Sequence, residues 1–157
     1  MGRLLGTAIL WTHAVAGALW IGSSASFVIA GLALAPRSDE QRQFVERRAS
    51  RINGLAMFSA IVLVLTGMLN LGRVFQMRAG SLSPVFLYVL GVKIVLYLAM
   101  LMALGVAMRA IPAMRFDLQQ ESHDAVPRAM RTMLRAHIAT LAMGSIAMIL
   151  GLWLVGS

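Results

Sequence analysis

The sequence predicts an all-α fold, a single transmembrane domain over residues 1–157 built as an up-and-down bundle of four transmembrane helices. Its composition is one reason, because 59% of the residues are hydrophobic and only 13% are charged, which lies outside the usual range of soluble domains. The second reason is that each of four apolar segments exceeds the roughly 20 residues needed to cross a ~30 Å hydrocarbon layer. The segments run over residues 4–34, 52–75, 84–108 and 134–155. They are continuously apolar rather than alternating, which argues against a transmembrane β-barrel.

Segment 4–34 is expected to stay in the protein as a helix. Arg3 followed by an apolar stretch is typical of a signal peptide. The stretch is too long for a typical cleaved signal, however, and Trp11 and His13 interrupt its apolar part.

The connections between segments carry capping and turn signals. Ser38 or Asp39 is expected to cap a short helix that leads through Phe44 and Val45 into segment 52–75. The connection at 78–84 is short, with Pro84 suited to the first turn of the next helix. In the connection expected around residues 116–129, Ser122 and Pro127 are the expected caps or breaks before the last helix. Short connections predict that neighbouring helices are antiparallel.

The positive charge predicts which side of the membrane each connection faces. The chain has a formal net charge of +8, and most of its arginines lie in two connections. These arginines are Arg37, Arg42, Arg47, Arg48 and Arg51 in the first, and Arg109, Arg115, Arg128 and Arg131 in the second, with Arg135 at the start of the last segment. Because basic loops stay in the cytoplasm, both termini are expected on the outer side, the periplasm of a bacterial inner membrane. The lipid bilayer is thus the expected partner, and nucleic-acid binding is not expected.

Lys93 is the most informative residue inside a predicted span. It lies about nine residues into segment 84–108, or ~13 Å below the start of that helix. An unpaired ammonium at such depth costs at least ~2.5 to 3.5 kcal/mol on insertion scales. A partner, a water-filled cavity or a neutral lysine is therefore expected, and a partner would be a haem propionate, a quinone oxygen or backbone carbonyls rather than an acidic side chain. All six acidic residues lie in the arginine-containing connections: Asp39, Glu40, Glu46, Asp117, Glu121 and Asp124.

His13 enters segment 4–34 at a depth close to that of Lys93. Thr66 and Asn70 lie one turn apart in the outer half of the second segment, and Tyr97 lies one turn beyond Lys93. If these faces converge, the polar residues form one site in the outer leaflet, where Gly17 leaves room beside the imidazole for a flat cofactor. Imidazole is a common ligand of metals and of haem iron. The alternative is a histidine that only donates a hydrogen bond to Thr66 or Asn70.

His137 is a second, weaker candidate for a metal ligand. It follows Arg135 at the cytoplasmic start of the last segment, which predicts an offset of ~10 to 20 Å from His13 along the membrane normal. One iron cannot easily bind both imidazoles, so inner and outer sites would be separate. The alternative is hydrogen bonding at the interface. With no cysteine in the chain, any metal must be held by histidine, methionine, carboxylate or a cofactor.

Three motifs resemble the membrane domain of the copper resistance protein D (CopD) family. They are His13-x3-Gly17-x2-Trp20-x-Gly22, Phe58-Ser59 leading to Thr66-Gly67-x2-Asn70, and Tyr88-x4-Lys93. The chain is also similar to HemJ, the membrane protoporphyrinogen oxidase. The resemblance covers the first three segments and implies either copper handling or, as in HemJ, binding of haem b through a first-helix histidine with a lysine nearby. Residues 21–34 contain no arginine, a departure from the HemJ pattern.

Two classes of function follow from these patterns. A copper-handling or copper-transporting protein would receive the ion at His13, whereas a haem-b-binding redox subunit would use His13 as the axial ligand and pair Lys93 with a propionate. Either would have a redox or metal-delivery protein as its partner on the outer face. A third hypothesis is a structural subunit or oligomer within a larger membrane complex. The sequence carries no nucleophile triad, phosphate loop or paired catalytic carboxylates, so ordinary hydrolase or kinase chemistry is not expected.

Overall fold

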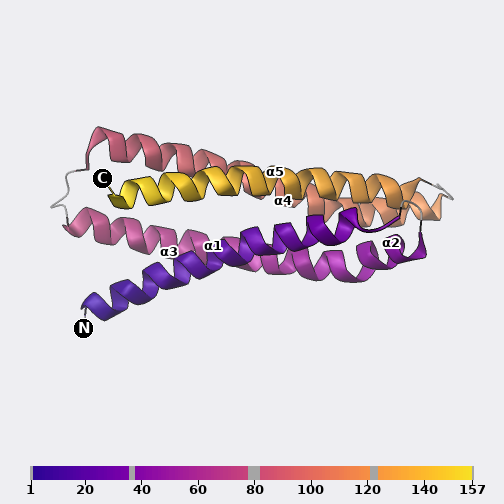
Figure 1. The fold of residues 1–157 in the computed structure, drawn as a ribbon, viewed down its shortest axis with the longest axis horizontal. Coiled ribbons are helices and arrows are strands. Elements are labelled where there is room, and N and C mark those ends of the chain that lie inside the picture. Colours follow the sequence, from indigo (N-terminus) through magenta and orange to yellow (C-terminus); the bar gives the residue numbers. More distant parts are fainter. Residues whose placement is uncertain (1, 36–37, 78–81, 121–123, 157) are drawn as a thin grey trace.

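A computed structural model describes residues 2–35, 38–77, 82–120 and 124–156 and confirms the predicted all-α fold. Four helices in these ranges are long and apolar enough to cross a membrane, so the chain is a multi-pass membrane protein. Its elements in chain order are α1 (Gly2–Leu32), α2 (Asp39–Gln43), the π-helical turn η1 (Phe44–Ala49), α3 (Ser50–Met77), α4 (Pro84–Gln119) and α5 (Ala125–Gly156) (Figure 1).

The helices form two antiparallel pairs. Helix α1 packs along α3, α4 packs along α5, and α1 also contacts α5, while the contact between α3 and α4 is slighter. The start of α1, the end of α3, the start of α4 and the end of α5 lie at one end of the bundle (Figure 1). This end is called the terminal end below. At the other end α1 and α4 end and α2 and α5 begin, and this end is called the arginine-rich end below.

The helices extend past the predicted apolar spans at the arginine-rich end. Helices α2, η1 and α3 form one span over Asp39–Met77, begun by the Ser38 hydroxyl, which accepts a hydrogen bond from the Gln41 amide at 3.1 Å. This confirms the predicted cap. The Ser83 hydroxyl caps α4, with Pro84 in the first turn as expected. Most of the connection predicted around 116–129 is helical instead, and Pro127 lies in the first turn of α5, while Ser122 falls outside the described residues.

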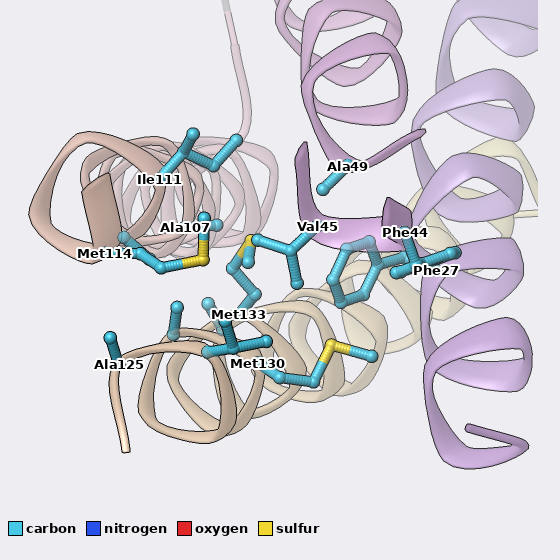
Figure 2. Packing of buried hydrophobic residues seen from close by; sticks show 14 residues of the cluster. Phe27, Phe44, Val45, Ala49, Ala107, Ile111, Met114, Ala125, Met130 and Met133 are labelled. Carbon is cyan, nitrogen blue, oxygen red and sulfur yellow. The ribbon is translucent and has the colours of Figure 1, made fainter. Parts of the chain in front are cut away.

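The main hydrophobic core lies toward the arginine-rich end. The π-helical turn buries Phe44, Val45 and Ala49, and these side chains meet methionines Met130 and Met133 of α5 (Figure 2). Flexible thioethers fill the irregular gaps between the helices. The connection between α1 and α3 therefore contributes side chains to the core rather than only crossing the surface.

Packing becomes sparser toward the terminal end. A second cluster in the middle of the bundle contains Trp20, Ala56, Ala60, Met100 and Leu104. Beyond it, Val89 is the only residue of the first four turns of α4 that is buried within the described chain. The terminal half thus leaves its polar side chains less enclosed than the arginine-rich half does.

Candidate functional site

His13 is held by a hydrogen-bond chain that fixes its tautomer. Its Nδ1 lies 2.8 Å from the Thr66 hydroxyl oxygen, and the same hydroxyl donates to the Val62 carbonyl at 2.6 Å. A hydroxyl has one hydrogen to donate, so Thr66 must accept from His13, and Nδ1 carries the proton. The lone pair is therefore on Nε2, which makes no hydrogen bond within the described residues.

Two glycines bring α1 and α3 together around this imidazole. A Cβ atom at Gly67 would lie 3.4 Å from Cε1 of His13, so the glycine makes room for the ring. A Cβ at Gly17 would lie 3.8 Å from a methyl group of Leu63, an ordinary contact. Gly17 therefore faces Leu63 of α3, and room for a flat cofactor beside Gly17 stays a prediction.

Lys93 approaches the same half of the bundle from the other helix pair. Its Nζ lies 3.1 Å from where a Cβ atom at Gly151 would stand, so the ammonium rests on the backbone of α5. It is close enough to His13 to interact with it electrostatically. Within the described chain Lys93 is half-buried and makes no hydrogen bond or ion pair. The ion pairs found among these residues, Arg42–Glu46 and Arg128–Asp117, lie at the arginine-rich end.

The other residues predicted for this site have different surroundings. The Tyr97 hydroxyl donates to the Ala60 carbonyl at 2.8 Å, and its ring meets Trp20 edge-on with centroids 5.4 Å apart. Tyr97 therefore ties α4 to α3 near the middle of the bundle. Asn70 is half-buried and makes no hydrogen bond within the described ranges.

The described residues form no ready-made cluster of histidine and carboxylate ligands for a metal ion. Among these residues, no group of three or more histidine and carboxylate side chains could hold a metal ion. The terminal half offers one oriented imidazole and the cationic side chains of Lys93 and Arg73, whose guanidinium lies against Gly6, so a ligand bound there must bring most of its own coordination. A negatively charged group on that ligand would also compensate the ammonium.

His137 lies in a closed polar cluster rather than at an open surface. Its Nδ1 is 3.2 Å from the Ser24 hydroxyl, its Nε2 is 3.1 Å from the Asn53 amide oxygen, and its ring stacks on Phe27 with centroids 4.3 Å apart. Only 2% of His137 is exposed. Since both ring nitrogens have partners, the arrangement favours hydrogen bonding over metal binding, and the bonds join α1, α3 and α5.

The two histidines are well separated along the bundle. Ser24, which contacts His137, follows His13 by eleven residues on α1, or about 16 Å along the helix axis. This separation agrees with the offset predicted from the sequence. The described structure therefore keeps the two imidazoles in different halves of the bundle.

Sequence reasoning missed Ser24 and Asn53. Ser24 is fully buried and Asn53 is 2% exposed, and the side-chain nitrogens of Asn53 and Trp20 are buried without an acceptor in the described chain. The available signal was an amide side chain at helical spacing from the small residues Ala56 and Ala60. Polar residues inside a span are candidates for interhelical hydrogen bonds.

Comparisons with known proteins identify no relative of the chain. No family model, no curated protein and no solved structure matches the chain. The geometry around His13 and Lys93 and the sequence motifs are therefore the observations that bear on function.

Proposed function

We propose that this membrane protein binds haem b in the terminal half of the bundle, with His13 as the axial ligand. The hydrogen-bond chain from His13 through Thr66 to the Val62 carbonyl supports this most directly. Histidines that bind metals usually donate their other ring N–H to a hydrogen-bond acceptor, which orients the ring and raises its basicity. His13 has this arrangement, and its Nε2 lone pair is free.

Lys93 supplies the second argument. It has no acidic partner among the described residues, and a buried ammonium favours a counter-ion. A haem propionate is an anion that the ligand itself would bring, so binding would compensate the charge that the fold leaves uncompensated. In this proposal His13 binds the iron, Thr66 orients the imidazole, and Lys93 pairs with a propionate. Bound haem would supply one-electron redox chemistry.

We further propose a bacterial inner membrane as the location, with both termini in the periplasm. The arginines concentrate at the opposite end of the bundle, as expected of a cytoplasmic side. A redox partner would then approach the terminal end from the periplasm.

Copper handling is the second candidate, and the resemblance to the CopD family favours it. A copper ion would need further ligands besides His13, and the nearby ammonium of Lys93 would repel it. Copper binding therefore requires donors beyond those the structure gathers around His13. The same purified protein tests both proposals.

The experiment is an absorption spectrum and metal analysis of protein purified from cells supplied with haem precursor and copper. Haem binding predicts a Soret band and reduced α and β bands that disappear in His13→Ala. Added imidazole should restore the bands in that variant, because it replaces the missing ligand without refolding the chain. Thr66→Val should lower haem affinity about 10- to 100-fold, and Thr66→Ser, which keeps the hydroxyl, should not.

A matched pair of substitutions tests the role of the Lys93 charge. Lys93→Met should weaken haem retention and Lys93→Arg should preserve it, since only the second keeps the positive charge. Stoichiometric copper without a chromophore would replace the haem proposal with the copper one. Protein that is folded by circular dichroism but contains neither haem nor copper would overturn both proposals. A structural subunit of a larger complex would then be the remaining hypothesis.

A further inference from the structure

A hollow lies between α4 and α5 toward the arginine-rich end, separate from the site around His13. Its volume is about 270 Å³. The residues that line it recur at helical spacing, so they form one face of each helix. They are Val106, Arg109, Ala110, Ala113, Met114 and Asp117 from α4, and Ala125, Arg128, Ala129 and Thr132 from α5.

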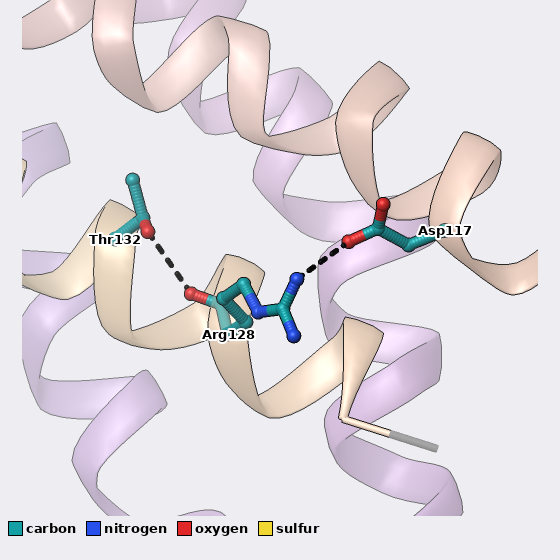
Figure 3. A network of polar contacts seen from close by, with 3 residues as sticks. All are labelled: Asp117, Arg128 and Thr132. Carbon is teal, nitrogen blue, oxygen red and sulfur yellow. Dashed lines mark hydrogen bonds and ion pairs between the residues drawn. The ribbon is translucent and has the colours of Figure 1, made fainter. Parts of the chain in front are cut away.

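The floor of this groove is apolar and its rim is charged. Four alanines keep the two helix backbones uncovered, which is what creates the hollow. An ion pair crosses the groove between Arg128 of α5 and Asp117 of α4, with the Nη1 and Oδ2 atoms 3.1 Å apart (Figure 3). Arg109 is exposed and makes no ion pair within the part of the chain that the structure describes.

The charges of the lining residues leave one positive charge unbalanced. Two guanidinium groups face one carboxylate, which gives a net charge of +1. Arg128 uses one of its five N–H donors on Asp117, so most of its donors remain free. Both arginines line the same hollow, and together they suit a phosphate carrying one negative charge.

The depth of the groove indicates what kind of molecule carries that phosphate. Arg109 directly follows the apolar span 84–108, and Val106 lies within that span. The groove therefore crosses the boundary between hydrocarbon and headgroups, with its apolar floor continuing into the lipid-facing side of α4. A ligand that fits needs an anionic head and apolar tails in the same molecule.

We propose that this groove binds the headgroup of an anionic phospholipid, with the phosphate between Arg109 and Arg128 and the glycerol over the alanine floor. A volume of about 270 Å³ is below the roughly 300 to 1,000 Å³ of pockets that enclose a drug-sized ligand. It suits a headgroup whose acyl chains lie outside along α4. Basic pockets between transmembrane helices on the cytoplasmic side are known to bind anionic lipid headgroups.

The test is native mass spectrometry of the full chain released from nanodiscs of phosphatidylglycerol mixed with phosphatidylcholine. The wild type should retain phosphatidylglycerol in preference to phosphatidylcholine. Arg109→Gln and Arg128→Gln should each reduce the retained phosphatidylglycerol about 5-fold, the effect of one lost basic residue. Ala113→Leu, which fills the floor and keeps every charge, should reduce retention of both lipids in the groove.

Arg115→Gln is the matched control, because Arg115 is exposed on the same helix and does not line the groove. A loss as large as that of Arg109→Gln would show a general surface charge effect and overturn the site. Equal retention of the two lipids by the wild type would overturn it as well. Displacement of the lipid by millimolar inorganic phosphate would show a simple anion site, and insensitivity to Ala113→Leu would show that the groove is not occupied.

Discussion

The two halves of the bundle treat a buried histidine in opposite ways. In the arginine-rich half, His137 bonds through both ring nitrogens and stacks on Phe27. In the terminal half, His13 has a hydrogen bond between Nδ1 and the Thr66 hydroxyl and the backbone carbonyl of Leu63 near its ring, and no hydrogen bond of Nε2 is found in the described structure. The comparison teaches that the residue type alone does not make a binding site. A histidine whose partners are complete holds helices together, and one with a free, oriented nitrogen can bind a ligand.

The difference follows from how much side chain each half can bury. The arginine-rich half gains Phe44 and Val45 from the π-helical turn, and both fill the space beside Phe27. The terminal half has no corresponding element among the described residues, and there the lysine rests on a glycine. Fewer packed neighbours leave more of the polar groups available to a ligand.

Replacing each histidine by alanine should give the largest contrast. His137→Ala leaves the Ser24 hydroxyl and the Asn53 side-chain carbonyl buried without a partner and opens a cavity. It should therefore lower the free energy of unfolding by about 3 kcal/mol. His13→Ala removes the hydrogen bond between a half-buried side chain and Thr66. It should therefore lower the free energy of unfolding by less than about 1 kcal/mol. Reversible unfolding in mixed micelles, followed by circular dichroism, measures both in the ligand-free protein. Equal losses of unfolding free energy in the two variants would contradict the proposed difference between the two halves.

Substitutions at two glycines should give a difference in stability of intermediate size. A Cβ at Gly144 would lie 3.2 Å from Ile21 and 3.3 Å from Met100, whereas one at Gly91 would meet nothing within 4 Å. Gly144→Leu should therefore destabilise the protein by about 2 kcal/mol through overpacking. Gly91→Leu on the open part of α4 should change the free energy of unfolding by less than about 0.5 kcal/mol. The same unfolding assay distinguishes them, and a costly Gly91→Leu would show that the terminal half is closed.

The two asparagines of α3 should give the smallest contrast. Asn53→Ala removes the acceptor of the His137 Nε2–H and should cost about 1 kcal/mol, within the range measured for interhelical hydrogen bonds in membranes. Asn70→Ala removes no hydrogen bond found in the described structure, so its effect on stability should be near zero. If Asn70→Ala instead weakened haem retention, Asn70 would contact the ligand as the sequence motif implies.

Much of the fold could be predicted because it depends on local patterns. Ser38 and Pro84 mark helix starts through the geometry of a single turn, and the apolar segments are read directly from hydropathy. The length of α4 was missed, since residues 109–119 are polar enough to read as a loop. They remain helical because Ala110, Ile111 and Met114 pack into the core, which hydropathy cannot show.

The candidate site was predictable only in part. The depth of His13 and Lys93 and the lack of acidic residues nearby could be counted along the chain. The partners of His137 could not, because Ser24 and Asn53 lie 113 and 84 positions away in sequence. Which residues of two helices face each other depends on helix rotation, and a rotation of one residue moves a side chain by about 100°.

By itself, the sequence determined that this chain crosses a membrane four times and that it carries a lysine and a histidine into the terminal half without an acidic residue beside them. Hydropathy and charge are properties of each residue, so they can be read from the sequence without knowing which residues are in contact. Only the tertiary structure decided that Thr66 leaves His13 with a free Nε2 while Ser24 and Asn53 occupy both nitrogens of His137. The reason is physical: hydrogen bonds between helices depend on distance and rotation, which the packing of the whole bundle sets.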